Sequence, residues 1–222
     1  MKSEYIKESA HKAQQKNFSL NEKPIVILEP FTTDLDFQAV LDKINFLVPD
    51  HLMRDFEIIY IGNVREFKTG QFNALWDDGA IYVSPDQDNA ADLIDDIIHE
   101  IAHSIEKRYE EVLYGDAELE QEFLAKRRHL KYLVDKPTMS MLAYNNPDYQ
   151  PEFDNHLYNE LGYDYLRNIS SELFYSPYAI TSLREYWANG FENYLLGNPN
   201  VLEATSPVLF KKILQILDKN EE

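Results

Sequence analysis

The segment from about Asn89 to Tyr109 constrains the fold more than any other part of the chain. Its apolar residues recur at helical spacing and form a broad stripe, at Ile94, Ile97, Ile98, Ile101, Ala102 and Ile105. A stripe of this width has to be covered by other elements, so the segment predicts a helix that lies in the core. The same helix carries the run HEIAH at 99–103.

This run has the HExxH spacing that zinc peptidases use. Residues four apart lie one above the other on a helix, so His99 and His103 point the same way and could share one zinc ion, with Glu100 beside them. The chain has no cysteine, which excludes thiolate zinc sites, iron–sulfur clusters and disulfides. Any metal therefore has to be held by His, Asp or Glu.

A zinc site of this kind needs a third protein ligand. The pattern HExxHxxGxxH is excluded, because Glu106 and Tyr109 stand where it requires Gly and His. The ligand should then be a carboxylate from a later helix. The acids that follow the motif closely lie in highly charged surroundings and are expected to be solvated: Glu106, Glu110, Glu111, Glu118, Glu120 and Glu122. The candidates that remain are Glu160, Glu172, Glu185, Glu192 and Glu203.

Glu185 lies in the run REYWANGFENYLL at 184–196, where aromatic and small residues allow a carboxylate to be buried. A buried Glu needs a partner, and a divalent cation is a suitable one. Here the chain resembles the gluzincin metallopeptidases of the anthrax lethal factor catalytic domain type, which include the clostridial Pro-Pro endopeptidases. In that family HExxH is followed by a helix of the form E-[FY]-[FW]-A-E-x-F. Its first Glu is the third zinc ligand, and a catalytic Tyr stands seven residues before it.

The resemblance assigns the third zinc ligand to Glu185 and the catalytic tyrosine to Tyr178. It covers roughly Phe56 to Leu196 through three short matches. The distance from His99 to Glu185 is longer than in the family, which implies an insertion at about 109–164. Asn189 stands in place of the second acid of the family pattern, so it can accept a hydrogen bond but adds no charge.

The function that the resemblance implies is that of a zinc metalloendopeptidase, which hydrolyses a peptide bond with a metal-activated water. Glu100 is then the general base, Tyr178 donates a hydrogen bond to the oxyanion, and the strand at 80–84 pairs with the substrate backbone. Two alternatives stay open. One is a non-catalytic, zinc-stabilised structural or interaction protein of a larger assembly, and the other is a phage or mobile-element regulatory HExxH protease.

Two further groups of residues have both a functional and an ordinary interpretation. Asp96, one turn before His99, could orient its imidazole, although an acid in this half of a helix is more often solvated. His156 and Glu160 are four residues apart and could bind a metal as a pair, although His156 is expected to be a surface residue.

The charge of the chain limits its partners. It has 21 Lys+Arg against 39 Asp+Glu, a formal net charge of -18. Nucleic acids and anionic membranes bind chiefly through Lys and Arg, so the expected partners are a protein or peptide substrate and, in the structural alternative, a larger protein assembly. The residues before Pro24 contain no apolar core typical of a signal peptide, so the expected location is cytoplasmic or within an assembly.

The expected fold is α+β, a mainly helical zincin-like domain over 24–222 with a small sheet before the HExxH helix and a polar arm at 1–23. Short runs of β-branched and aromatic residues predict strands at 25–28, 56–62 and 80–84. Helical patterns follow Thr33 as far as Pro49, and then recur at about 116–134, 153–174, 178–196 and from Pro207 onward, with an irregular loop at 137–151.

Overall fold

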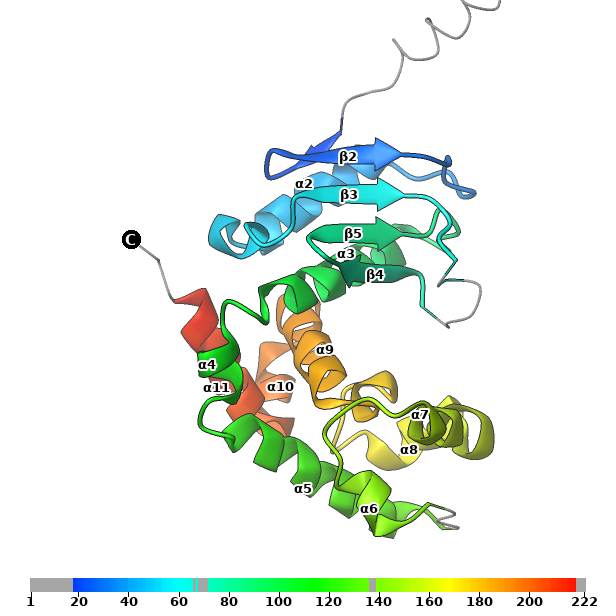
Figure 1. Ribbon diagram of the computed structural model, residues 1–222, viewed down its shortest axis with the longest axis vertical. Helices are drawn as coiled ribbons and strands as arrows, with labels where there is room; N and C mark the ends of the chain where they lie inside the picture. The colour runs from blue at the N-terminus through cyan, green and yellow to red at the C-terminus, as the bar shows by residue number, and fades with distance from the viewer. Residues whose placement is uncertain (1–17, 66, 68–71, 136–138, 219–222) are drawn as a thin grey trace, which may run out of the picture.

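The structure is a computed structural model that describes residues 18–65, 67, 72–135 and 139–218 (Figure 1). It confirms the predicted class: an α+β fold that is mainly helical, with a small sheet before the long HExxH helix. The strands are β1 (Ser19–Leu20), β2 (Lys23–Ile27), β3 (Ile58–Ile61), β4 (Ala74–Asp77) and β5 (Ala80–Val83). Figure 1 shows the sheet at one end of the molecule and most of the helices at the other.

The sheet has the strand order β1-β2-β3-β5-β4. The central strands β2, β3 and β5 run parallel, while β1 and β4 pair antiparallel at the two edges. Strand β4 was not predicted from the sequence. It forms a hairpin with β5 through Asp78 and Gly79, whose φ angles of 42° and 84° suit a tight two-residue turn. The strand that the sequence predicts at 80–84 is therefore internal, and β4 occupies the edge.

The helices and helical turns follow in chain order. They are α2 (Phe37–Leu47), η1 (Asp50–Met53), α3 (Ala90–Ile105), α4 (Glu110–Tyr114), α5 (Glu118–Leu133), α6 (Met141–Tyr144), α7 (Pro151–Asn155), the π-helical turn η3 (His156–Leu161), α8 (Tyr163–Ser170), η4 (Tyr178–Ile180), α9 (Leu183–Leu196), α10 (Pro199–Thr205) and α11 (Pro207–Leu217).

Helix α3 is the predicted HExxH helix and lies in the middle of the fold. Asn89 begins it, because its side chain accepts hydrogen bonds from the N–H groups of Ala91 and Asp92. The apolar stripe is buried, and the helix packs against α2, β4 and β5 on the sheet side and against α9 on the other side (Figure 1). It ends at Ile105, four residues before the predicted end, and α4 follows as a separate short helix.

Several predicted boundaries differ from the structure. Residues 18–23, which were assigned to the polar arm, form β1 and the start of β2, and Leu20 is fully buried. Helix α2 starts at Phe37, because the side chain of Asp36 accepts a hydrogen bond from the N–H of Ala39. The hydroxyl of Thr33, the predicted cap, instead donates to the carbonyl of Gln87. The remainder of the arm, residues 1–17, lies outside the described residues.

The second half of the chain contains more helical elements than predicted. The 153–174 pattern is divided into α7, η3 and α8, because Gly162 takes a φ of 83° between the last two. The expected loop at 137–151 contains α6, and α10 was not predicted at all. The pattern at 178–196 is divided into η4 and α9, with Ser182 between them as the cap of α9.

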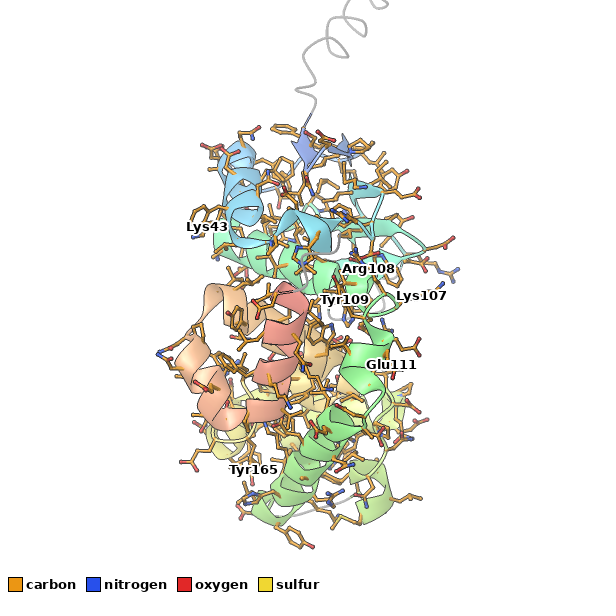
Figure 2. The ribbon with its side chains drawn as sticks, turned by 90° about the vertical axis from the view of Figure 1, so that its left-hand side faces the viewer. Lys43, Lys107, Arg108, Tyr109, Glu111 and Tyr165 are labelled. Carbon is orange, nitrogen blue, oxygen red and sulfur yellow. The ribbon has the colours of Figure 1, made fainter. Side chains whose placement is uncertain are left out.

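The end of α3 is fixed to the sheet half of the molecule through Arg108 (Figure 2). Its guanidinium donates to the carbonyl of His51 at 2.8 Å and forms an ion pair with Asp55. The neighbouring Tyr109 is 1% exposed. The chain therefore leaves α3 in a defined direction, toward α4.

Helix α9 approaches α11 most closely at Gly190. A Cβ atom at this position would lie 2.2 Å from Cδ2 of Leu209, well inside van der Waals contact. The lack of a side chain at position 190 therefore allows the close packing of these two helices.

Gly190→Ala should destabilise the fold by about 1–3 kcal/mol, because the added methyl group must displace a packed leucine. The measurement is the free energy of unfolding from chemical denaturation. In a Leu209→Ala background the same substitution should cost much less. An equal cost in both backgrounds would show that the close approach to Leu209 is not the cause.

Candidate metal centre

The packing of α9 on α3 brings His99, His103 and Glu185 together. One turn of α3 separates the two histidines, and their ring centroids are 4.9 Å apart. Ser182 begins α9 and accepts a hydrogen bond from the N–H of Glu185 at 3.2 Å, which places this glutamate in the first turn of the helix. The three side chains come from positions that the sequence analysis named.

The distances within this group suit a zinc ion. Oε2 of Glu185 lies 3.0 Å from Nε2 of His99 and 3.5 Å from Nε2 of His103. Ligands about 2.0–2.1 Å from a tetrahedral zinc ion are about 3.3 Å apart, a value between these two distances. Within the described residues, this is the one group of three His, Asp or Glu side chains whose ligand atoms all lie within 4.8 Å of one another. The set could hold zinc with a fourth position left for substrate or water.

Each of the two imidazoles has a further carboxylate beside its Nδ1 atom. Nδ1 of His103 lies 2.6 Å from Oε1 of Glu106, and Nδ1 of His99 lies 3.4 Å from Oε2 of Glu192. A carboxylate only accepts hydrogen bonds, so each pair favours the proton on Nδ1 and leaves Nε2 as the metal ligand. Carboxylate–histidine pairs of this kind orient the ring and raise its basicity in metal sites.

Glu106 was expected to be solvated, but it is 8% exposed and belongs to the site. Besides His103, its carboxylate accepts hydrogen bonds from Nε of Arg184 at 2.8 Å and from the hydroxyl of Tyr114 at 3.4 Å. The prediction was wrong because charged neighbours in sequence do not report burial in the fold. Its position three residues after His103, on the same side of the helix, is the signal that indicates the contact.

Asn189, which stands where the family has an acid, takes no part in holding His99. Its Oδ1 atom is buried without a hydrogen-bond partner among the described residues. Glu192, one turn further along α9, contacts the imidazole instead. Residues 185, 189 and 192 share one face of the helix, so Glu192 reaches His99 from the same face that carries Glu185.

The charges of the three-residue group act strongly on one another. Burial alone would raise the pKa of Glu185, but its hydrogen bonds to His103 and His99 hold that pKa far below its usual value. Burial would likewise lower the pKa of His103, but its bonds to Glu106 and Glu185 raise it to about 9. The pKa of His99 is raised well above its usual value, because Glu185 and Glu192 outweigh its burial. A divalent cation can take the place of these protons.

Glu100 lies next to the group and is 7% exposed. Its Oε2 atom accepts a hydrogen bond of 2.6 Å from the backbone N–H of Trp76 in β4. Burial raises the pKa of this carboxyl group, although the nearby histidines oppose the shift. A carboxylate that is held in place and has a raised pKa is suited to proton transfer near neutral pH.

The ring of Tyr178 lies beside the imidazole of His99, and the two ring centroids are 6.3 Å apart. Burial raises the pKa of its phenol, and the negative charges of Glu185 and Asp154 raise it further, so the hydroxyl keeps its proton and can donate it to a hydrogen bond. Tyr175 has no place in the cleft that Tyr178 lines, and its hydroxyl lies near Gly197 at the end of α9.

The other candidates lie elsewhere or have other partners. Asp96 accepts a hydrogen bond from Gln87 at 3.0 Å, so it is not the free surface acid that was expected. His156 is fully buried, which contradicts its expected surface position, and its Nδ1 lies 2.8 Å from Oε2 of the exposed Glu160. Glu172 and Glu203 are exposed.

The group lies in a cleft of about 1070 Å³. Residues of β4, of α3 and α9 and of the segment 147–163 line it. In Figure 1, β4 lies above α9 and α7 lies below it. Comparisons of the chain with protein-family models, with curated proteins and with solved structures find no match. Among the described helices, none is long and apolar enough to cross a membrane.

Zinc binding should strengthen with pH, because zinc needs the neutral imidazole and the metal-free protein holds His103 protonated up to about pH 9. In the metal-free protein this raised pKa stabilises the fold below pH 6.5, and the contribution is lost as the pH rises through 9. The apparent affinity for zinc, measured by competition with a chromophoric chelator, should rise at least about tenfold per pH unit from pH 7 to 9.

His103→Gln should abolish zinc binding, whereas His129→Gln, which changes an exposed histidine, should not. Equal zinc affinities of these two variants would contradict the assignment of His103 as a ligand.

Glu106→Gln and Glu192→Gln should each weaken zinc binding by about tenfold or more, because each removes the charge that orients an imidazole. Asn189→Ala is the matched control on the same face of α9, and it should leave the affinity nearly unchanged. Nitrogen NMR of the histidine rings should report a shift of the proton away from Nδ1 in the two glutamine variants. A loss of affinity in Asn189→Ala that equals the loss in Glu192→Gln would contradict this assignment.

Proposed function

We propose that the protein is a zinc-dependent endopeptidase. The observation that carries this proposal is that the three possible zinc ligands, a buried carboxylate and a phenol converge in one cleft beside the edge of a sheet. His99, His103 and Glu185 would hold the metal. Zinc in such a set supplies Lewis acidity toward water and toward the scissile carbonyl.

Two side chains would carry the proton transfers and the charge. Glu100 takes a proton from the attacking water and later delivers it to the leaving amine, for which its burial and raised pKa are suited. Tyr178 donates a hydrogen bond from its neutral phenol to the oxygen on which negative charge develops. The same residues were named from the sequence for these roles.

The strand that would receive the substrate is β4, which corrects the expectation from the sequence. The strand predicted for this role, at 80–84, is paired on both sides by β3 and β4 and has no free edge. Strand β4 pairs only with β5 within the described residues, and Ala74, Leu75 and Trp76 line the cleft. An extended peptide can add to an edge of this kind through backbone hydrogen bonds. The bond from the N–H of Trp76 to Glu100 joins this edge directly to the proposed base.

Glu100→Gln tests the proposal most directly. The variant should keep its zinc and its fold but lose proteolysis, because an amide does not accept the proton of the attacking water. The measurements are zinc content and cleavage of a peptide library by the zinc-loaded protein. A wild-type protein that binds zinc but cleaves nothing would favour the structural alternative, and an active Glu100→Gln variant would exclude Glu100 as the base.

Tyr178→Phe should lower the turnover rate by about 10²- to 10³-fold, the range for the loss of one oxyanion donor. Zinc content and substrate binding should remain nearly unchanged, because the hydrogen bond forms in the transition state. Tyr175→Phe is the matched control, since its hydroxyl lies at the end of α9. Equal losses in the two variants would remove Tyr178 from the mechanism without affecting the zinc site.

A further inference from the structure

The wall of the cleft across from β4 carries a cluster of tyrosines that neither the zinc set nor the proton transfers use. Tyr149, Tyr158 and Tyr163 line the cleft together with Asp154. Their elements are the loop before α7, the turn η3 and the start of α8, all within the segment 109–164 that the resemblance drawn from the sequence implies to be an insertion. Large aromatic side chains gathered at a cleft mark a place where a ligand side chain can bind.

The tyrosines pack on one another and on a carboxylate in this part of the cleft. The rings of Tyr158 and Tyr163 are nearly perpendicular, with centroids 5.1 Å apart and an interplanar angle of 87°. The hydroxyl of Tyr149 donates to Oδ2 of Asp154 at 2.7 Å, and within the described residues the other oxygen of that carboxylate accepts no hydrogen bond. The side chains of Tyr149 and Tyr158 are 52% and 41% exposed, so ring surface and a carboxylate oxygen remain open to a ligand.

The charge of the cleft favours a cationic occupant. The described residues that line it include nine carboxyl side chains and one guanidinium, that of Arg184. Arg184 uses its Nε for Glu106. The pKa of Asp95 is raised to about 6 by burial and by the charge of Glu192, and burial raises that of Asp96 to about 6 as well. A zinc ion would offset the charge of the acids around His99 and His103, while Asp148 and Asp154 line the part of the cleft that carries the tyrosines. A positively charged ligand group is attracted to these two carboxylates, whereas an anionic one is repelled.

We propose that Tyr149, Tyr158, Tyr163 and Asp154 form a subsite for a lysine or arginine side chain of the peptide substrate. An ammonium or guanidinium group is attracted to the faces of tyrosine rings and to a carboxylate at the same time. The proposal rests on the proposed peptidase function, which it deepens by naming the substrate class.

The subsite and the proposed reacting centre share one cleft. Asp154, Tyr178 and Glu185 all line it. The cationic residue would therefore lie in the same cleft as the bond to be cleaved, on the side of the peptide that faces away from β4.

The wall that carries the subsite is held firmly by one buried cation. Arg127 of α5 is fully buried, donates to the carbonyls of Ala143 and Asn146, and lies 4.1 Å from the ring centroid of Phe153. Phe153 and the neighbouring His156 are fully buried as well. The tyrosines therefore project from a packed support, which lowers the entropic cost of ordering them around a ligand.

Binding of short peptides to the zinc-loaded Glu100→Gln protein tests the proposal without cleavage. The probes are blocked, fluorescent octapeptides of Ala and Gly that carry one lysine at each position in turn, and a second set with norleucine in place of lysine. Fluorescence anisotropy should show one position at which lysine binds about tenfold more tightly than norleucine. Adding Asp154→Asn or Tyr158→Leu should remove this preference, and Tyr158→Phe, which keeps the ring, should retain it.

Asp148→Asn is the matched control, because Asp148 lines the same cleft, is exposed, and loses the same charge. It should keep the preference for lysine. An equal loss of the lysine preference in Asp148→Asn and Asp154→Asn would overturn the subsite in favour of a general negative field, and so would the absence of any lysine preference in the parent protein.

Cleavage by the wild-type protein separates the subsite from the peptidase function. If the wild-type protein cleaves library peptides without a preference for lysine or arginine, the subsite fails and the peptidase stands. If lysine peptides bind as expected but the wild-type protein cleaves nothing, the peptidase fails and the subsite stands.

Discussion

The contact between α3 and α9 is the constraint on which the rest of the structure depends. The indole of Trp187 is fully buried and donates to the carbonyl of Ala102 at 3.0 Å, so one hydrogen bond fixes the two helices to each other in the middle of the HExxH turn. Such a bond, inside an apolar contact, is expensive to break because both groups would be left unpaired. The distances between Glu185 and the two histidines follow from this crossing, since each ligand stands on a rigid helix.

Negative charge is concentrated around the same contact, and this concentration needs a cation to be stable. Four acids lie where α3 packs on α9: Glu100, Glu106, Glu185 and Glu192. Among the described residues that line the cleft, Arg184 is the one with a permanent positive charge. In the metal-free protein, protons on the histidines supply the missing charge, which is why the pKa of each is raised despite burial. A divalent ion would supply the same charge at neutral pH without protons, so metal binding and folding should be tightly linked.

The sequence predicts the parts of this site that depend on local spacing. Helix α3, its HExxH run and the α+β class follow from periodicity, and Glu185 follows from its aromatic surroundings together with the family pattern. Strand β4 could not be found in the same way, because four residues at a sheet edge show little alternation, although the Asp78-Gly79 turn indicates a hairpin. Glu106 was assigned to solvent because its sequence neighbours are charged, whereas its hydrogen-bond partner Arg184 lies far away in the sequence.

The chemistry and the proposed recognition of substrate rest on separate supports, and this separation follows from which elements pack together. The ligands, the base and the phenol stand on α3, α9 and η4, which contact one another directly. The tyrosine wall stands on α7, η3 and α8 and is anchored instead through Arg127 of α5. Because Tyr149 and Tyr158 are exposed and contribute little to the core, side chains on this wall can change without moving a zinc ligand. The two parts are joined by a backbone hydrogen bond of 2.8 Å from the N–H of Leu183 in α9 to the carbonyl of Pro147. They are also coupled electrostatically, because the negative charges of Glu185 and Asp154 both raise the pKa of Tyr178.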